Sequence, residues 1–201
     1  MNTFYLVRHG QKQPMIGEPE LTELGHQQAE KTGLYLRQFP VQRIFTSPSR
    51  RTLQTATHIA EHLQVPVETH THLRERANWG DDPLQSFSEF LEMWHESSQN
   101  RHLQPAVGDS SFAAGQRMEE VMKQLQQTDV PDLHVVLVTH GGIIGDFLRN
   151  IFGDERLEQI LKDMDQLHSY KISECSITTI KMDNETPTLH TLAFTGHLTT
   201  T

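Results

Sequence analysis

The sequence predicts an α/β domain whose main strands run parallel and whose last two strands form an antiparallel edge. Three short apolar runs, at residues 4–7, 43–46 and 135–139, have the β-branched and aromatic content of buried strands. Segments with helical periodicity separate these runs, as in parallel sheets whose strands are joined through helices. Residues 176–182 then alternate as a strand, and residues 188–194 follow as its antiparallel partner.

The first two helices have recognisable starts. Thr22 begins a helix that we expect to run to about Phe39, with an imperfect apolar stripe. After the strand at 43–46, Ser47 fits an N-cap, and Pro48 fits the first helical position, where a missing N–H costs nothing. The apolar spacing that follows predicts a helix from Pro48 to Leu63.

A short strand and a long helical segment follow. Residues 65–68 predict the strand. From 81 to about 128 the sequence is mostly helical, with a loop containing Pro and Gly at 104–111. We expect this segment to form a helical cap over the functional site.

The last elements complete a single domain. Residues 143–152 predict a helix that ends at Gly153 in a C-cap position. The antiparallel strands are expected to turn at residues 183–185. Because no repeat, low-complexity tract or linker interrupts the chain, we expect residues 1–201 to form one domain.

Composition excludes several classes of partner. A formal net charge of −9 disfavours nucleic acid and anionic membranes. Cys175 is the only cysteine, so no internal disulfide can form and a reducing compartment is expected. No apolar run approaches the roughly 20 residues that span a bilayer, and no signal peptide is evident. We therefore expect a cytoplasmic protein.

Cations and histidines follow the strand ends. Arg8 and His9 come directly after the first strand, the pair Arg50 and Arg51 follows the second, and His140 follows the most apolar one. If these strands run parallel, their ends meet at one edge, where open α/β sheets bind ligands. Two imidazoles and at least two guanidiniums would then share a pocket that suits an anion.

That residue set fits phosphoryl transfer without a metal ion. Arginine binds phosphate oxygens through its planar fork, so Arg8 and either Arg50 or Arg51 could hold the group. The neutral imidazole of His9 could attack phosphorus, and His140 could contact the same oxygens. Protonating the leaving alcohol requires an acid, for which Glu75, Asp81 and Asp82 are the candidates.

Five ordered motifs carry a resemblance to a known family. They are Leu6-Val7-Arg8-His9-Gly10; Leu21-Thr22-Glu23-Leu24-Gly25 with Gln28-Ala29; Ser47-Pro48 with Arg51 and Gln54-Thr55-Ala56; Leu73-Arg74-Glu75; and Val138-Thr139-His140-Gly141-Gly142. Together they resemble the histidine phosphatase superfamily, which has the phosphoglycerate mutase-like fold, and within it the small bacterial phosphatases. The likeness extends from about Phe4 to Leu198.

The resemblance implies a three-layer α/β/α fold and a metal-independent phosphohistidine mechanism. By motif position His9 corresponds to the nucleophile and Glu75 to the proton donor, while Arg8, Arg51 and His140 correspond to the phosphate clamp. The motif position thus implies that Arg51, and not Arg50, holds the phosphate group. The resemblance implies a phosphorylated small molecule as substrate, with no cofactor and no metal ion.

The chain also departs from the family pattern near the substrate. Met15 occupies the position of an Asn that helps to hold phosphate, so Gln11, Lys12 or Gln13 could take its place. After Glu75, the usual Gly-x-Trp-Glu-Gly pattern is replaced by Asn78-Trp79-Gly80-Asp81. We include Gln11, Lys12, Gly141 and Trp79 as candidate substrate-binding residues.

Two alternative functions remain open. The first is a phosphoglycerate mutase that uses a bisphosphate primer, but the short segment between Glu75 and His140 and the lack of a basic tail after Leu198 favour a hydrolase. The second is a non-catalytic module that binds a phosphorylated metabolite, although none of the five key residues is missing. The sequence does not assign an oligomeric state.

Two further patterns have ordinary structural interpretations. His58-Ile59-Ala60-Glu61-His62 matches a zinc-protease pattern, but no further ligand is apparent and the chain has 13 histidines, so we interpret it as chance spacing. Phe87 and Trp94 are expected to pack the helical segment over the sheet, while Trp79 fits either packing or the substrate mouth.

Overall fold

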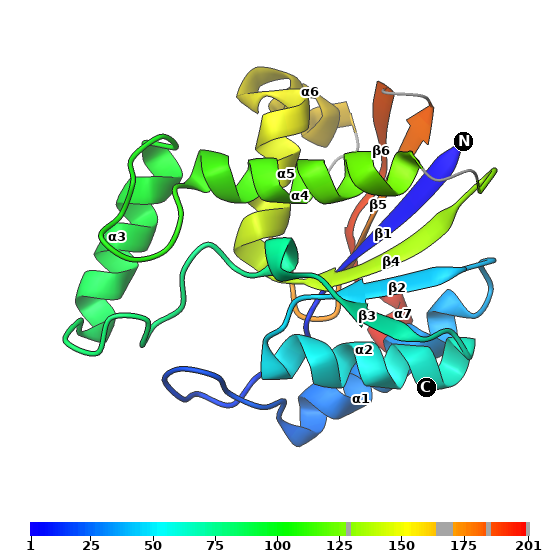
Figure 1. Cartoon of the computed structure of the whole chain (residues 1–201), viewed down its shortest axis with the longest axis horizontal. Helices are drawn as coiled ribbons and strands as arrows, with labels where there is room; N and C mark the ends of the chain where they lie inside the picture. Colours follow the sequence, from blue (N-terminus) through cyan, green and yellow to red (C-terminus); the bar gives the residue numbers. More distant parts are fainter. Residues whose placement is uncertain (128–129, 164–170, 184–185, 200–201) are drawn as a thin grey trace.

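A mixed six-stranded sheet lies between two layers of helices (Figure 1). The computed structural model describes residues 1–127, 130–163, 171–183 and 186–199. The expected turn at 183–185 therefore lies partly outside the described residues. No helix in the described part of the chain has the length and apolar character needed to cross a membrane.

The strand order is β3-β2-β4-β1-β5-β6. The strands are β1 (Asn2–Arg8), β2 (Arg43–Thr46), β3 (Val67–Thr69), β4 (His134–Thr139), β5 (Ile177–Asp183) and β6 (Thr186–Phe194). The pairs β1–β4, β4–β2 and β2–β3 are parallel, whereas β5 is antiparallel to both β1 and β6. This arrangement confirms the predicted mostly parallel sheet with an antiparallel edge.

Helices cover both faces of the sheet (Figure 1). On one face are α1 (Glu23–Leu36), α2 (Arg50–Leu63) and α7 (Gly196–Thr199); on the other are α4 (Ser111–Gln126), α5 (Gly141–Phe152) and α6 (Asp154–Asp163). Alternation along β1 explains the three layers. Phe4 and Leu6 pack in the cluster that includes α4 and α5, while Tyr5 and Val7 pack against α1 and α2. Burying each such side chain stabilises the fold by about 1.5–3 kcal/mol.

The segment between β3 and α4 leads away from the sheet. A single 3-10 turn (Thr71–Leu73) follows β3, and α3 (Phe87–Gln99) then stands apart from the two layers, at the left of Figure 1. A capping box fixes the start of α3. The Ser86 hydroxyl accepts from the Glu89 backbone N–H, and the Glu89 carboxylate accepts from the Ser86 backbone N–H. Only Ser97 of α3 is fully buried.

The sequence misplaced several element boundaries. The second helix begins at Arg50 after Ser49, not at Pro48 after Ser47. The Ser47 hydroxyl accepts only a long bond from the Ser49 amide (3.4 Å), and its shorter bond is to the His140 ring (2.8 Å), a tertiary contact that no local pattern contains. The first helix ends at Leu36 rather than Phe39, β3 begins at Val67 rather than Val65, and α6 was not predicted.

Candidate active site

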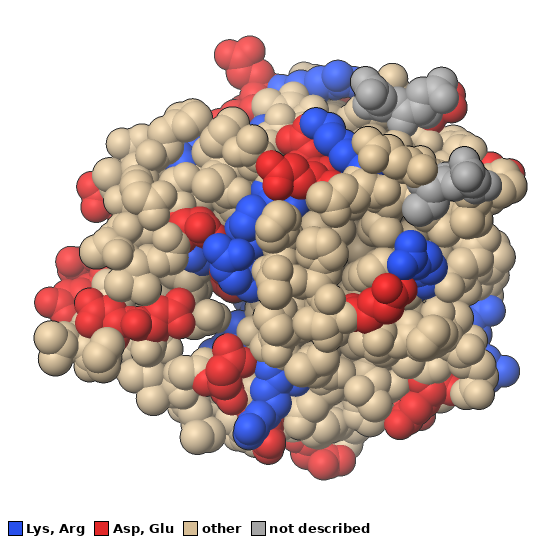
Figure 2. Space-filling model, in the orientation of Figure 1, with Lys and Arg blue, Asp and Glu red and all other residues tan. Residues whose placement is uncertain are grey.

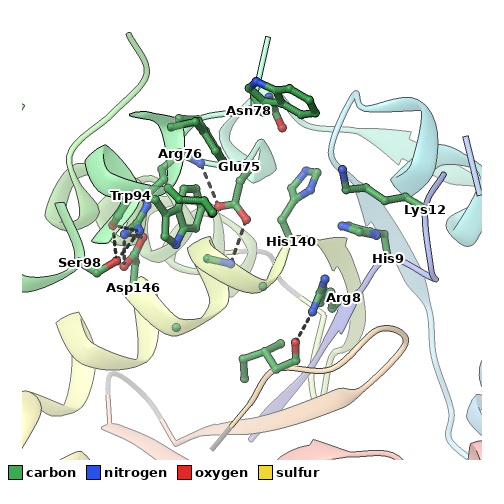
Figure 3. Close-up of a pocket in the computed structure, with 18 of the residues that line it drawn as sticks. Arg8, His9, Lys12, Glu75, Arg76, Asn78, Trp94, Ser98, His140 and Asp146 are labelled. Carbon is green, nitrogen blue, oxygen red and sulfur yellow. Dashed lines mark hydrogen bonds and ion pairs between the residues drawn. The ribbon is translucent and has the colours of Figure 1, made fainter. Parts of the chain in front are cut away.

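A cavity of about 620 Å³ opens at the carboxyl edge of the parallel strands (Figure 3). The strand register creates this common edge, since Arg8 pairs with Thr139 and Thr46 pairs with Val138. The residues that follow these strands therefore emerge side by side. Arg8, His9 and His140 all line the cavity, as does Arg51 from the first turn of α2.

His9 presents one ring nitrogen to the cavity. Its Nδ1 lies 2.7 Å from the carbonyl oxygen of Gly10, which can only accept, so Nδ1 carries the proton and Nε2 keeps its lone pair. Burial, followed by the positive charge of Arg51, holds the pKa of His9 well below its ordinary value. The ring is thus neutral at physiological pH, and a neutral imidazole is a nucleophile.

Gly10 permits this backbone path beside His9. A Cβ at Gly10 would lie 2.5 Å from the carbonyl oxygen of Gly25 at the start of α1, closer than real Cβ contacts come. The Gly10 amide also donates to the Thr55 hydroxyl of α2 (3.1 Å). The loop after β1 is therefore held against both α1 and α2.

His140 lies beside His9, with 5.4 Å between the ring centroids. An Arg51 guanidinium nitrogen, which can only donate, lies 3.1 Å from Nδ1 of His140. Nδ1 therefore accepts, and Nε2–H donates to the Ser47 hydroxyl at 2.8 Å. Complete burial, and next the charge of Arg51, keeps the pKa of His140 well below its usual value.

The two arginines at the strand-end side of the cavity, Arg8 and Arg51, each retain a buried donor. Arg8 donates to the carbonyl of Ile172 and to the carboxylate of Glu174, both at 2.7 Å, while Arg51 donates to Asn78 Oδ1 at 2.8 Å. The Nε groups of Arg8 and Arg51 are buried and have no hydrogen-bond partner among the described residues. A buried donor without an acceptor is costly, which favours the binding of an acceptor beside these two side chains.

Lys12 adds a third cation beside them (Figure 3). Its pKa is lowered by burial first and then by the charges of Arg51 and Arg8. This mutual repulsion among cations is relieved when a dianion binds between them. The strand-end side of the cavity is therefore electrostatically suited to a phosphate group.

Glu75, in the loop after the 3-10 turn, lines the same cavity, and its carboxylate lies at the start of α5. Its carboxylate accepts backbone N–H bonds from Gly142 and Ile143 of α5, each 2.9 Å long, and from Arg76 at 3.0 Å. A carboxylate at a helix N-terminus also interacts favourably with the helix dipole. These bonds fix the position of the acid relative to His9 and His140.

The structure brings together most of the candidate residues but not all. Arg8, His9, Arg51, Glu75 and His140 line the same cavity, and so do Lys12, Trp79 and Gly141. Gln11 does not line it, and its side-chain oxygen instead accepts from the Thr22 hydroxyl at 2.8 Å.

The other residues named in the sequence analysis are divided between the cavity lining and the surface. Met15 is exposed and does not line the cavity, while Asn78 does line it and bonds Arg51. Arg50, the alternative to Arg51, pairs with Glu20 on the exposed surface. The Asp81 carboxylate accepts from the backbone N–H of Asn78 at 2.8 Å and so shapes the loop after Glu75.

Sequence reasoning missed the far half of the cavity. Its additional lining residues include Arg76, Phe90, Leu91, Ser98, Asp146 and Arg149. Asp146 had a usable signal, because it is a charged residue within the apolar run of α5. Phe87, for which we favoured packing, does both: its ring centroid lies 4.8 Å from that of Trp79, and its half-exposed side chain lines the cavity. Trp94 also lines the cavity, and it packs on Arg76 as well.

The zinc-protease pattern lies on α2, outside the cavity lining. His62 bonds Glu30 of α1 (2.8 Å), and His58 bonds His26 at 2.9 Å. Within the described ranges, no three or more His, Cys, Asp and Glu side chains converge as a metal site.

Comparison with known proteins points to one family. A family model described as the histidine phosphatase superfamily, branch 1, matches residues 4–195. The uncharacterized phosphatase PhoE of Bacillus subtilis is 28% identical over 162 residues, covering 77% of this chain and 80% of that protein. A probable phosphoglycerate mutase GpmB of Yersinia pestis is 29% identical over 161 residues, 74% of each chain.

Solved structures share the fold over nearly the whole chain. A mycobacterial glucosyl-3-phosphoglycerate phosphatase, in complex with inorganic phosphate, superposes with a TM-score of 0.77 at 23% identity, covering 98% of this chain and 99% of the other. The phosphoserine phosphatase of Entamoeba histolytica, in complex with 3-phosphoglyceric acid, gives 0.70 at 21% identity, covering 98% and 100%. The predicted fold class is confirmed.

Proposed function

This chain belongs to the histidine phosphatase superfamily, and on that premise we propose that it hydrolyses phosphomonoesters through a phosphohistidine on His9, without a metal ion. One observation carries the proposal. His9, whose Nδ1 is bonded to Gly10 and whose Nε2 keeps its lone pair, lines the same cavity as the cations Arg8 and Arg51, which supports a nucleophile beside an anion site.

The first half-reaction transfers the phosphoryl group to the protein. The Nε2 lone pair of His9 attacks phosphorus, and the bond from phosphorus to the ester oxygen breaks. The departing alkoxide takes up a proton, and we assign its delivery to the carboxyl group of Glu75. Arg8, Arg51 and Lys12 offset the charge on the phosphoryl oxygens, and charge-assisted bonds from guanidinium are about twice as strong as neutral ones.

The second half-reaction restores the free protein. Glu75, now a carboxylate, takes a proton from a water molecule as the water oxygen attacks phosphorus. The bond from phosphorus to Nε2 then breaks, and inorganic phosphate leaves. His9 regains its neutral ring and Glu75 its proton, so the cycle is balanced.

Trapping the intermediate tests the proposal directly. The protein, treated with EDTA, is mixed with a ³²P-labelled alkyl phosphate and quenched in base within milliseconds. We expect label that is stable in base, labile in acid and located on His9 by peptide mapping. Label on another residue, no label at all, or activity that returns only on adding a divalent metal would contradict the proposal.

A second assay, with different substrates, separates a hydrolase from a mutase. With 3-phosphoglycerate and a trace of 2,3-bisphosphoglycerate, a hydrolase releases inorganic phosphate, whereas a mutase produces 2-phosphoglycerate. We expect phosphate release to dominate. Production of 2-phosphoglycerate at a higher rate would support the mutase alternative.

Glu75 can reach its position because residue 142 is glycine. A Cβ at Gly142 would lie 2.6 Å from Glu75 Oε1 and 2.7 Å from the Trp94 ring. Gly142→Ala is therefore expected to displace the carboxylate and to lower kcat by about 100-fold, the cost of a misplacement near 1 Å. The loss should be larger for alkyl phosphates than for 4-nitrophenyl phosphate, whose leaving group needs little protonation.

Gly33→Ala is the matched control for this variant. Its Cβ would meet the His62 ring at 2.7 Å, a comparable clash between α1 and α2 outside the cavity. It should lower stability but not kcat of the folded protein. If both leaving groups slow equally in Gly142→Ala, Glu75 is not the proton donor.

The cellular compartment of the protein and the extent of its domain stay predictions. Cys175 is the single thiol, it is buried, and burial raises its pKa to about 12, so it is unreactive as well as unpaired. This fits the proposed cytoplasmic location. We further propose one domain over residues 1–201, with the segment at about 81–128 acting as its cap.

A further inference from the structure

We propose that the alcohol side of the substrate carries a large apolar group, preferably aromatic, which lies against α3. This inference rests on the proposed function, because it concerns the same cavity. The proposed substrates are phosphomonoesters of bulky apolar alcohols, which we expect the protein to hydrolyse in preference to small polar phosphometabolites.

The cavity has two chemically different ends. At the strand edge are His9, His140 and the cations. Beyond Glu75 the wall is formed by the loop after it and by α3, and its large apolar lining residues are Trp79, Phe87, Phe90, Leu91 and Trp94. In Figure 2 the surface is hollowed between the α3 side, at the left, and the rest of the molecule, with Lys and Arg side chains beside the hollow.

Folding alone does not account for this apolar wall. Phe87 is 51% exposed and Leu91 is 49% exposed, although both are large apolar residues of one helix. The loop after β1 lies against this wall, since its Gly17 lines the cavity and the Gly17 amide bonds the Trp79 carbonyl at 3.0 Å. Ile16 beside it is also exposed. Clustered exposed apolar residues mark binding surfaces, and this cluster adjoins the phosphate end of the cavity.

The two arginines in the same half, Arg76 and Arg149, are already paired within the protein. Arg76 bonds Asp146 at 3.2 Å and also donates to the Trp94 carbonyl and the Ser98 hydroxyl. Arg149 binds Asp154 at 2.6 Å and the Ser98 carbonyl at 2.8 Å. A carboxylate on the substrate would have to compete with these bonds. The far end therefore favours an uncharged group.

The size of the cavity fits the same conclusion. Its volume of about 620 Å³ lies within the range of pockets that hold drug-sized ligands. A phosphate group fills only a small part of it, so an aromatic ring attached to the alcohol has room. Aromatic side chains such as Trp79 and Phe87, whose ring centroids are 4.8 Å apart, offer faces and edges for that ring.

Two substrates that differ only in the apolar group test the inference. 2-Phenylethyl phosphate and ethyl phosphate have leaving alcohols of similar basicity, so their chemical steps are comparable. We expect kcat/KM to be about tenfold or more higher for the phenylethyl ester, since even one methylene in an apolar pocket changes this ratio by roughly tenfold. 3-Phosphoglycerate and phosphoserine should be poorer substrates than the phenylethyl ester.

Variants locate the preference on α3. Phe87→Ala and Leu91→Ala should each lower the phenylethyl-to-ethyl ratio about threefold, and the double variant should bring it near one. Leu34→Ala is the matched control. Leu34 is also a helical leucine with 49% exposure, but it lies on α1 outside the cavity lining. This variant should leave the ratio unchanged.

Binding of phosphonates distinguishes the two proposals. Calorimetry should show that 3-phenylpropylphosphonate binds more tightly than propylphosphonate, whether or not the protein hydrolyses esters. Equal affinities, or turnover of both esters with a ratio near one, would overturn the apolar subsite and leave the proposed function intact. Tighter binding of the phenyl compound without turnover of either ester would overturn only the proposed function.

Discussion

Replacing His9 with alanine is expected to lower kcat at least 10⁴-fold, the scale of losses when a nucleophile is removed. The imidazole supplies the only atom that forms a bond to phosphorus in the proposed first step. Arg8, Arg51 and Lys12 remain, so the variant should still bind inorganic phosphate. Steady-state hydrolysis of 4-nitrophenyl phosphate gives kcat, and calorimetric titration with phosphate gives the affinity.

His197 provides the matched control for His9→Ala. It is a second buried histidine, it bonds Thr32 at 3.0 Å, and burial lowers its pKa to about 4. It lies outside the cavity lining, so His197→Ala should change stability while kcat stays within about threefold. Retention of wild-type kcat in His9→Ala would exclude the phosphohistidine. An unchanged cellular function of His9→Ala would instead support the binding-module alternative.

Replacing Arg76 with methionine is expected to lower the free energy of unfolding by about 3–5 kcal/mol at neutral pH. The Arg76 side chain is only 3% exposed, pairs with buried Asp146, and lies 3.7 Å above the Trp94 ring. Its loss leaves a buried carboxylate without a cation and removes two bonds to α3. Urea denaturation at pH 8, 7 and 5.5 measures the effect.

The pH dependence of this loss has a definite sign. Burial raises the pKa of Asp146 to about 6, although Arg76 opposes the rise. Without Arg76 the folded-state pKa rises further above the unfolded value, so the protonated form is the one that suits the fold. The destabilisation should therefore be largest at pH 8 and shrink as pH falls toward about 6, the folded-state pKa of Asp146 in the wild type. An equal loss at all three pH values would contradict this account.

Arg43→Met is the control for Arg76→Met. Arg43 also pairs with a carboxylate, Glu68, at 2.8 Å, and it lies 4.5 Å above the Phe45 ring, but its side chain is 33% exposed. Exposed pairs of this kind contribute about 0–1 kcal/mol. A loss in Arg43→Met as large as that in Arg76→Met would mean that burial is not the cause.

The strand-end residues illustrate what local sequence can predict. Arg8, His9 and His140 follow apolar runs that are recognisable as buried strands, and parallel strands bring their carboxyl ends to one edge. The meeting of these side chains could therefore be expected before any coordinates. The signal for the start of α3 is equally local, because Ser86 and Glu89 form a capping box within four residues.

Ser47 and Glu75 show where local reasoning ends. Ser47 has the residue type of an N-cap, but its hydroxyl bonds His140, which is 93 positions away in the chain. Glu75 was known as a candidate acid, yet only the fold places its carboxylate on the amides that begin α5. Local patterns describe which residues can cap a helix, not which distant group will compete for them.

The sequence by itself determined the order of the six strands and of most helices, together with the group of cations and imidazoles at one sheet edge. Both follow from periodic burial along the chain, which short-range patterns encode. The tertiary structure alone decided the far half of the cavity, where Arg76 of one loop pairs with Asp146 of α5, 70 positions later. Such pairing depends on the packing of distant segments, so it appears only once the chain has folded.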